Sequence, residues 1–159
     1  MEIGEPELLA SQHIVADFHC SESSLDEWLK RKALKNQTIG ASRTFIICTS
    51  DSKHVIGFYA LATGSVQRQI VSGALRRNMP EPIPILVLER LAVDARYHSL
   101  GLGVGLLKDA VLRSRQVAEQ VGTKALLVHA LSDNAHAFYR HWGFISSEIQ
   151  PSTLLLPLW

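Results

Sequence analysis

Three glycines at alternate positions, Gly101, Gly103 and Gly105, constrain this chain more than any other feature. Residues 85–93 before them form an apolar run broken by one acidic and one basic residue, and after them apolar residues recur at helical spacing. A strand therefore passes through a glycine turn into a helix. Glycine tolerates φ > 0 and leaves the backbone amides uncovered, and a helix start offers unpaired N–H groups. Such a turn can hold a phosphate or pyrophosphate.

The glycine pattern alone does not name a ligand, because glycines at a strand-to-helix turn also serve close packing alone. Two phosphate-binding motifs are excluded. A P-loop needs Gly-Lys-Ser/Thr where this chain has Gly105-Leu106-Leu107, and a dinucleotide fingerprint belongs to an early βα unit. The flanking sequence has to decide between packing and binding.

Length and composition indicate one folded domain over residues 1–159, with 47% apolar and 19% charged residues. No apolar run approaches the length of a membrane span, and the acidic first residues do not resemble a secretion signal. We therefore expect a cytoplasmic protein. Cys20 and Cys48 are too few and too far apart for a zinc framework, and Cys48 lies in an apolar run that predicts a buried thiol. We expect no disulfide and no metal.

Charge is distributed unevenly along the chain. Residues 28–80 hold nine basic residues and a single acidic one, whereas the rest holds seven basic and 14 acidic residues. A solvated helix face accounts for the basic group at residues 30–35 as well as a binding role does. A second group, Arg68, Arg76 and Arg77, favours contact with a polyanion. The charge suggests such a partner without naming it.

The first half of the chain predicts a helix, a hairpin and a loop. Residues 24–27, Ser-Leu-Asp-Glu, form a capping box for a helix that ends near Gly40. Residues 43–49 and 55–63 are rich in β-branched and aromatic side chains, which predicts an antiparallel hairpin. Residues 64–84 carry three prolines at alternate positions and predict a surface loop or a short helix. The residues before Cys20 show no clear period.

The second half predicts alternating helices and strands. The helix after the glycines is expected to run to Val121 and to stop at Gly122. Residues 124–130 predict a central strand buried on both faces, and residues 132–143 a short helix capped by its first serine. Residues 153–158 predict a last strand, placed at an edge or a strand end because its proline cannot donate.

This order of elements, together with Ala135-x-x-Phe138-Tyr139-x-x-x-Gly143-Phe144, resembles the GNAT superfamily of acetyl-CoA-dependent N-acetyltransferases. The family's turn reads Arg/Gln-x-x-Gly-x-Gly/Ala, which the chain matches at its first two glycines but not at His98. A frequent Asn before the tyrosine is Ser132 here. The resemblance implies an α+β fold of α/β/α type, with a mixed, mostly antiparallel sheet of about six or seven strands and about four helices.

A closer similarity covers nearly the whole chain. It is to the TacT-like toxins, which acetylate the amino group of aminoacyl-tRNA and pair with a ribbon-helix-helix antitoxin. The Arg-Arg-x-Met-Pro loop is the most specific motif, because general acetyltransferases lack it. The matching motifs are Leu25-Asp26-x-Trp28-Leu29, Gly57-Phe58-Tyr59-Ala60-Leu61, Arg76-Arg77-x-Met79-Pro80-x-Pro82-Ile83-Pro84, Arg90-Leu91-Ala92-Val93-Asp94 and Val128-His129-Ala130.

The resemblance implies acetyl-CoA as co-substrate, with its pantetheine arm between the strands at residues 85–93 and 124–130. A backbone N–H of Val93 or Leu91 would stabilise the oxyanion of the thioester. The residues expected to bind the coenzyme are Leu91, Ala92, Val93, His98, Ser99, Leu100, Gly101, Leu102, Gly103, Val104, Gly105, Ser132, Asn134 and Phe138.

Tyr139 is expected to protonate the leaving thiolate as the general acid, the alternative being a merely packed aromatic ring. The attacking α-amine titrates near ~8 or below, so it needs a weak base or none. Two roles are open for Glu89: it acts as a base through a water molecule, or it is simply paired with the neighbouring Arg90. His129 and His136 face either solvent or the core, and their spacing predicts no metal site.

The resemblance also implies the partners. These are aminoacyl-tRNA, a ribbon-helix-helix antitoxin, operator DNA only through the antitoxin complex, and a second copy in a homodimer, with no membrane. The cations expected to contact tRNA phosphates are Lys35, Arg76 and Arg77, then Lys30, Arg31 and Arg43. Acetylation of the amino group would block translation. The alternatives are a GNAT enzyme acting on a small amine or a protein N-terminus, and a non-catalytic regulatory module that binds nucleic acid.

Overall fold

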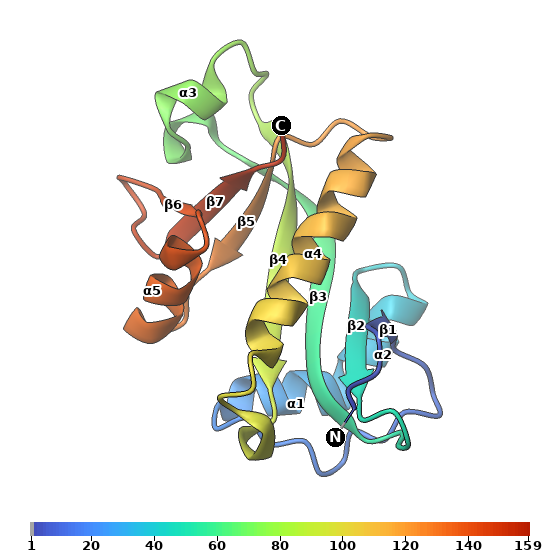
Figure 1. Cartoon of the computed structure of the whole chain (residues 1–159). Coiled ribbons are helices and arrows are strands. Elements are labelled where there is room, and N and C mark those ends of the chain that lie inside the picture. Colours follow the sequence, from blue (N-terminus) through green and yellow to red (C-terminus); the bar gives the residue numbers. More distant parts are fainter. Residues whose placement is uncertain (1) are drawn as a thin grey trace. The chain divides into compact units, whose positions relative to one another are not determined.

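The computed structural model describes residues 2–159 and contains one seven-stranded sheet with strand order β1-β2-β3-β4-β5-β7-β6 (Figure 1). Strands β4 and β5 run parallel, while β1·β2, β2·β3, β5·β7 and β6·β7 are antiparallel. The predicted sheet is thereby confirmed. The strands are β1 (Glu7–Leu8), β2 (Arg43–Cys48), β3 (Val55–Val66), β4 (Ile83–Val93), β5 (Ala125–His129), β6 (Ile145–Ser146) and β7 (Thr153–Pro157).

Five α-helices are present in the described residues, one more than the expected four. They are α1 (Ser23–Arg31), α2 (Ala33–Thr38), α3 (Gly73–Arg76), α4 (Leu102–Ala118) and α5 (Asp133–His141), with 3-10 helices η1 (Arg68–Ile70) and η2 (Ala95–Tyr97). The chain divides into two compact units. The first holds residues up to Ala62 together with Arg90–Ala110, and the second holds Thr63–Glu89 and Val111–Trp159.

An aromatic group forms the centre of the first unit. The Phe18 ring meets Phe58 edge-on at 5.5 Å, and Trp28 stacks on Phe58 at 6.1 Å. All three belong to one buried apolar cluster that joins α1 to β3. Burying such large rings stabilises this unit. Trp28 is thereby buried between α1 and β3.

The start and the continuity of the first predicted helix are corrected. Helix α1 is preceded by Glu22 and has no side-chain cap, so Ser24 lies inside the helix and the capping box is wrong. The Asp26 carboxylate instead accepts a hydrogen bond from the Cys20 N–H at 2.9 Å. A non-helical Lys32 then separates α1 from α2, so one expected helix is two.

The predicted hairpin of β2 and β3 is confirmed, with Phe45 opposite Tyr59. Strand β3 runs to Val66, three residues beyond the expected end. Strand β1 pairs with β2 through Glu7 and Leu8 and was not predicted, because two residues are too few to show a period.

The second unit is built on β5, which pairs with the first part of β4 on one side and with β7 on the other. The predicted central position of β5 is confirmed. Strand β7 lies between β5 and β6 and ends at Pro157, so of the two expected placements of the proline the strand end is confirmed and the sheet edge is not. The predicted surface loop holds η1 and α3, and its Leu75 and Ile83 are buried with Leu127.

The turn into α4 differs from the prediction in two ways. The helix begins at Leu102, so only Gly101 among the three glycines has a positive φ, of +77°, and Ser99 shares that region at +67°. At the other end the helix finishes at Ala118, and Gly122 is not among the residues of positive φ. The predicted stop at Gly122 is therefore wrong. No helix in residues 2–159 is long and apolar enough to cross a membrane.

Candidate active site

The turn between β4 and α4, residues 94–101, is held by one buried carboxylate in the first unit. Asp94 is fully buried, and its Oδ1 accepts hydrogen bonds from the Arg96 backbone N–H and Nε, both at 2.9 Å. Its Oδ2 accepts from Arg96 Nη2 at 2.9 Å and from the His19 N–H at 3.1 Å. Burial alone would raise the pKa of Asp94, but these hydrogen bonds outweigh it and hold the pKa at about 2. The carboxylate is therefore ionised at neutral pH.

His98, which stands where the GNAT turn has Arg or Gln, points back to the strand. Its Nε2 lies 2.8 Å from the Val93 carbonyl oxygen, so the ring donates to that carbonyl as the Nε2–H tautomer. This contact closes the turn from β4. The expected contact between His98 and the coenzyme stays a prediction.

The start of α4 offers free donors next to open space. The amides of Leu102, Gly103 and Val104 precede the first intrahelical bond, from Gly105 N–H to the Gly101 carbonyl at 3.1 Å. A Cβ at Gly101 or Gly105 would meet nothing within 4 Å, and one at Gly103 would come no nearer than 4.0 Å, to Val93. Uncovered amides at the positive end of a 17-residue helix suit a pyrophosphate.

Close packing within the first unit fixes the position of this helix start. A Cβ added at Gly57 of β3 would lie 3.0 Å from Leu106 and from Ile47. Glycine at that position therefore lets α4 approach β3. The Tyr59 hydroxyl, also on β3, donates a hydrogen bond to the Asp109 carboxylate on α4.

Tyr139 lies on α5 in the second unit and is 6% exposed. Its ring meets Phe138 at 5.2 Å and Phe144 at 5.3 Å, both edge-on. Burial raises the pKa of Tyr139 above its ordinary value, so the phenol keeps its proton at neutral and moderately alkaline pH. Within the described residues the hydroxyl has no hydrogen-bond partner. It is free to donate to a ligand.

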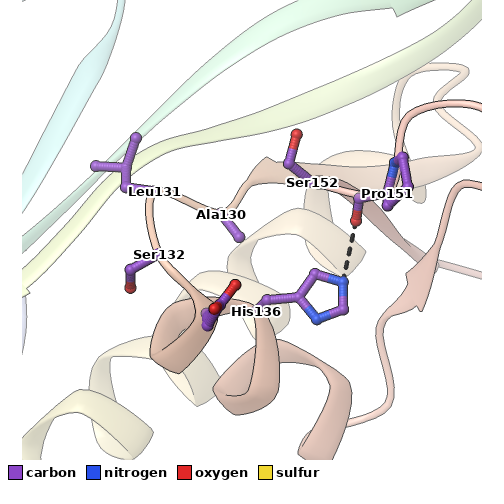
Figure 2. Close-up of a pocket in the computed structure, with 7 residues that line it drawn as sticks. Ala130, Leu131, Ser132, His136, Pro151 and Ser152 are labelled. Atoms are coloured by element: carbon purple, nitrogen blue, oxygen red, sulfur yellow. Dashed lines mark hydrogen bonds between the residues drawn. The ribbon is translucent and has the colours of Figure 1, made fainter.

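The predicted cap of α5 is confirmed, since the Ser132 hydroxyl accepts from the Ala135 N–H at 3.1 Å. The same residue borders a pocket of about 490 Å³ at the end of β5 (Figure 2). The pocket is lined by Ala130, Leu131, Ser132, Asp133, His136, Pro151 and Ser152. Ser132 was named from the sequence, but the pocket was missed. Pro151 and Ser152 lie next to Ser132 only because β7 pairs with β5, and a local sequence pattern does not show that pairing.

Both histidines of this region are tied to the segment around the start of β7. His136 Nε2 lies 3.0 Å from the Pro151 carbonyl oxygen, the dashed contact in Figure 2, and His129 Nδ1 lies 3.0 Å from Thr153 Oγ1. Of the two orientations left open, His129 is exposed to solvent, whereas His136 is half-buried. No group of three or more potential metal ligands occurs in residues 2–159.

The basic residues expected to meet tRNA are all exposed, and they belong to both units. Lys30, Arg31, Lys35 and Arg43 lie on α1, α2 and β2, where Arg31 pairs with Glu27. In the second unit Arg76 ends α3 and Arg77 follows it. Arg68 donates to the Arg76 carbonyl at 3.3 Å, and its own N–H donates to Glu81 at 3.2 Å, which orders this loop.

Residues 90 and 89 lie on β4 and have different surroundings. The Arg90 guanidinium lies over the Trp28 ring, 5.1 Å from its centroid. Glu89 is half-buried, with its Oε1 covered. A base role for Glu89 stays a prediction.

The expected coenzyme residues thus form two groups. Leu91 to Gly105 come together at the end of β4 and the start of α4, in the first unit. Ser132, Asn134, Phe138 and Tyr139 come together at the start and on the length of α5, in the second unit. Asp94 was missed as a site residue, although its motif was noted, because its partner His19 lies far away in sequence.

Comparisons with known proteins agree with this geometry. Residues 41–146 match the acetyltransferase (GNAT) domain family. A tRNA-acetylating toxin of Mycobacterium tuberculosis is 45% identical over 95% of this chain and 90% of its own length. The structure of AtaT complexed with acetyl-methionyl-tRNAfMet superposes with a TM-score of 0.90 at 26% identity, covering 98% of this chain and 95% of that one.

A second solved structure carries other ligands. It is a tyrosine-to-phenylalanine variant of the toxin AtaT bound to the C-terminus of the antitoxin AtaR and acetyl-CoA, with a TM-score of 0.83 at 25% identity over 99% of this chain and 94% of that one. The family match covers more than half of the chain, and the mycobacterial relative nearly all of it. The chain belongs to the GNAT acetyltransferase family and, within it, to the group of tRNA-acetylating toxins.

Proposed function

We propose that this protein is a toxin-type N-acetyltransferase that moves an acetyl group from acetyl-CoA to the amino group of aminoacyl-tRNA and so blocks translation. The observation that carries the proposal is the 45% identity to a tRNA-acetylating toxin over 95% of the chain. The free amides at the start of α4 and the protonated Tyr139 support it, because they supply an anion site and an acid.

Each group of residues has a separate role in this proposal. The amides of Leu102, Gly103 and Val104 bind the pyrophosphate, and acetyl-CoA supplies the thioester when bound. The amine nitrogen forms a bond to the acetyl carbon, and the bond from that carbon to sulfur breaks. A backbone N–H of Leu91 or Val93 stabilises the oxyanion in between. Tyr139 gives its proton to the thiolate, water takes the proton of the amine, and the phenolate regains a proton from solvent.

The tRNA contacts are proposed for the exposed cations. Arg76 and Arg77 stand on a loop ordered by Arg68, which reduces the entropy cost of meeting phosphates. Lys35 is the third principal contact, followed by Lys30, Arg31 and Arg43. Such contacts set affinity and salt dependence more than the choice of tRNA.

The proposed partners follow the relatives. AtaT binds the C-terminus of the antitoxin AtaR in its solved complex. For this chain we propose a ribbon-helix-helix antitoxin, operator DNA bound only through the complex with it, and a homodimer. The cytoplasm is the proposed location, because the substrate would be found there.

A reconstituted translation reaction tests the proposal. Added protein should stop peptide synthesis only when acetyl-CoA is present, and freshly charged tRNA added after the protein has been removed should restore it. Inhibition without acetyl-CoA would favour a non-catalytic nucleic-acid-binding module. Undisturbed translation with acetyl-CoA present would favour a GNAT enzyme for another amine.

A further inference from the structure

We infer that Asp94 is a positioning residue for the coenzyme, one that orients the phosphate-binding amides of α4 without touching the ligand. The inference rests on the proposed coenzyme site at the start of α4. It assigns a role to the last residue of the Arg-Leu-Ala-Val-Asp motif.

The contacts of Asp94 join three segments of the first unit. Its own N–H donates to the Ile56 carbonyl of β3 at 2.8 Å, while its carboxylate binds Arg96 in the turn and the His19 N–H in the segment before α1. The next residue, Ala95, donates its N–H to the His19 carbonyl at 2.8 Å. Both backbone groups of His19 are thus used by the start of the turn.

A second buried carboxylate contacts the side chain of His19. Asp26 of α1, 5% exposed, lies 3.2 Å from His19 Nδ1 and also accepts from the Cys20 N–H. The segment that Asp94 binds is therefore itself fixed to α1. Asp94 connects the turn to an anchored part of the unit.

The turn needs such a clamp because it has two residues of positive φ. Ser99 and Gly101 lie between the clamp and the amides of α4, and glycine in particular has many conformations to lose. Donors that are already oriented bind an anion more tightly than donors that must first be ordered. Asp94 at one end and the His98 contact to Val93 together restrict the turn.

Equilibrium binding by calorimetry tests the role with two thioesters. Acetyl-CoA carries the pyrophosphate, and S-acetylpantetheine lacks it. Asp94→Asn keeps the shape but removes the charge from the hydrogen bonds, so it should weaken acetyl-CoA binding about tenfold. Binding of S-acetylpantetheine should change less than about twofold, since it does not reach the amides. Equal weakening of both thioesters, as a merely structural role predicts, would overturn the inference.

Two further variants keep the test decisive. Gln37→Ala removes two buried hydrogen bonds of the first unit, to the Leu9 carbonyl and from the Thr44 N–H, that involve neither the turn nor His19. It should lower the thermal stability while leaving the acetyl-CoA Kd within about twofold. Arg96→Gln changes an exposed side chain, folds even if Asp94→Asn does not, and should weaken acetyl-CoA binding about threefold. An unchanged Kd in Arg96→Gln would overturn the inference. Wild-type protein that does not bind acetyl-CoA at all would overturn the proposed function and this inference together.

Discussion

At the residue scale, Tyr139 combines burial with a hydroxyl that has no hydrogen-bond partner in residues 2–159. Removing only that hydroxyl in Tyr139→Phe should lower kcat for acetyl transfer about a hundredfold or more, because the thiolate then leaves without an acid. The acetyl-CoA Kd should stay within about twofold, since the ring still packs between Phe138 and Phe144.

The matched control for this variant is Tyr59→Phe. It also removes a buried hydroxyl, here one bonded to Asp109, so it should lower stability by about 1 kcal/mol and leave kcat of the folded protein intact. A Tyr139→Phe protein with wild-type kcat would show that Tyr139 is a packed ring and no acid.

The raised pKa of Tyr139 also predicts the pH profile of kcat. The rate should rise with pH as the attacking amine, whose pKa lies near ~8 or below, loses its proton. It should then stay level to about pH 10, because burial keeps the proton on Tyr139 beyond the ordinary pKa of a phenol. A fall in kcat between about pH 8 and 10 in a stopped-time assay would contradict this assignment.

Single residues were predictable where a local motif defines them. Gly101, Ser132 and Tyr139 have the expected positions in a turn, a cap and a helix. The role of Asp94 was not predictable, since its binding to His19 spans 75 residues and no local pattern reports such a contact. The orientation of the His98 ring toward the Val93 carbonyl was not predictable either, because a sequence pattern does not show which way a side chain points.

At the element scale, the turn into α4 separates two kinds of glycine. Gly101 has a φ of +77°, so Gly101→Ala should cost about 1 kcal/mol of folding free energy and weaken acetyl-CoA binding. Gly105 is helical and faces open space, so Gly105→Ala should instead stabilise the protein by about 0.5–1 kcal/mol. Urea unfolding measures the change in folding free energy for both variants. If both alanines stabilised or both destabilised the protein, the two glycines would not differ in backbone conformation as described.

The elements predicted correctly are those with long periodic patterns, such as the β2–β3 hairpin, β5 and α4. Two-residue strands such as β1 and β6 carry no period, so they were missed. The capping box failed because the helix begins at Ser23, so Ser24 is already helical and does not cap it. Pairing on both sides of β7 depends on tertiary order, which its proline could not reveal.

At the scale of the whole molecule, the uneven charge predicts a salt-dependent affinity for tRNA. Replacing Arg76 and Arg77 by Gln should weaken tRNA binding and reduce the slope of log K against log salt by about 0.7–0.9 for each phosphate that these arginines neutralise. The control Lys32→Gln/Lys53→Gln removes the same charge from exposed residues of the same basic segment. Filter binding at several salt concentrations measures this slope for both double variants. Equal slopes in the two variants would argue against a specific role for the arginine loop.

The fold and its family were predictable at this scale because several spaced motifs agree along the chain. The pocket beside Ser132 and His136 was not, since its lining comes from segments separated in sequence. The net charge of +1 for the whole chain also gives no sign of the basic segment, which appears only when the charge of residues 28–80 is counted separately.

The most direct measurement incubates the protein with labelled acetyl-CoA and total charged tRNA. We predict label on the amino group of the aminoacyl moiety, released from the tRNA by mild alkali as the N-acetyl amino acid, and no label on tRNA stripped of its amino acids. Charged tRNA that stays unlabelled, with active coenzyme binding in the same sample, would contradict the assignment of aminoacyl-tRNA as the substrate.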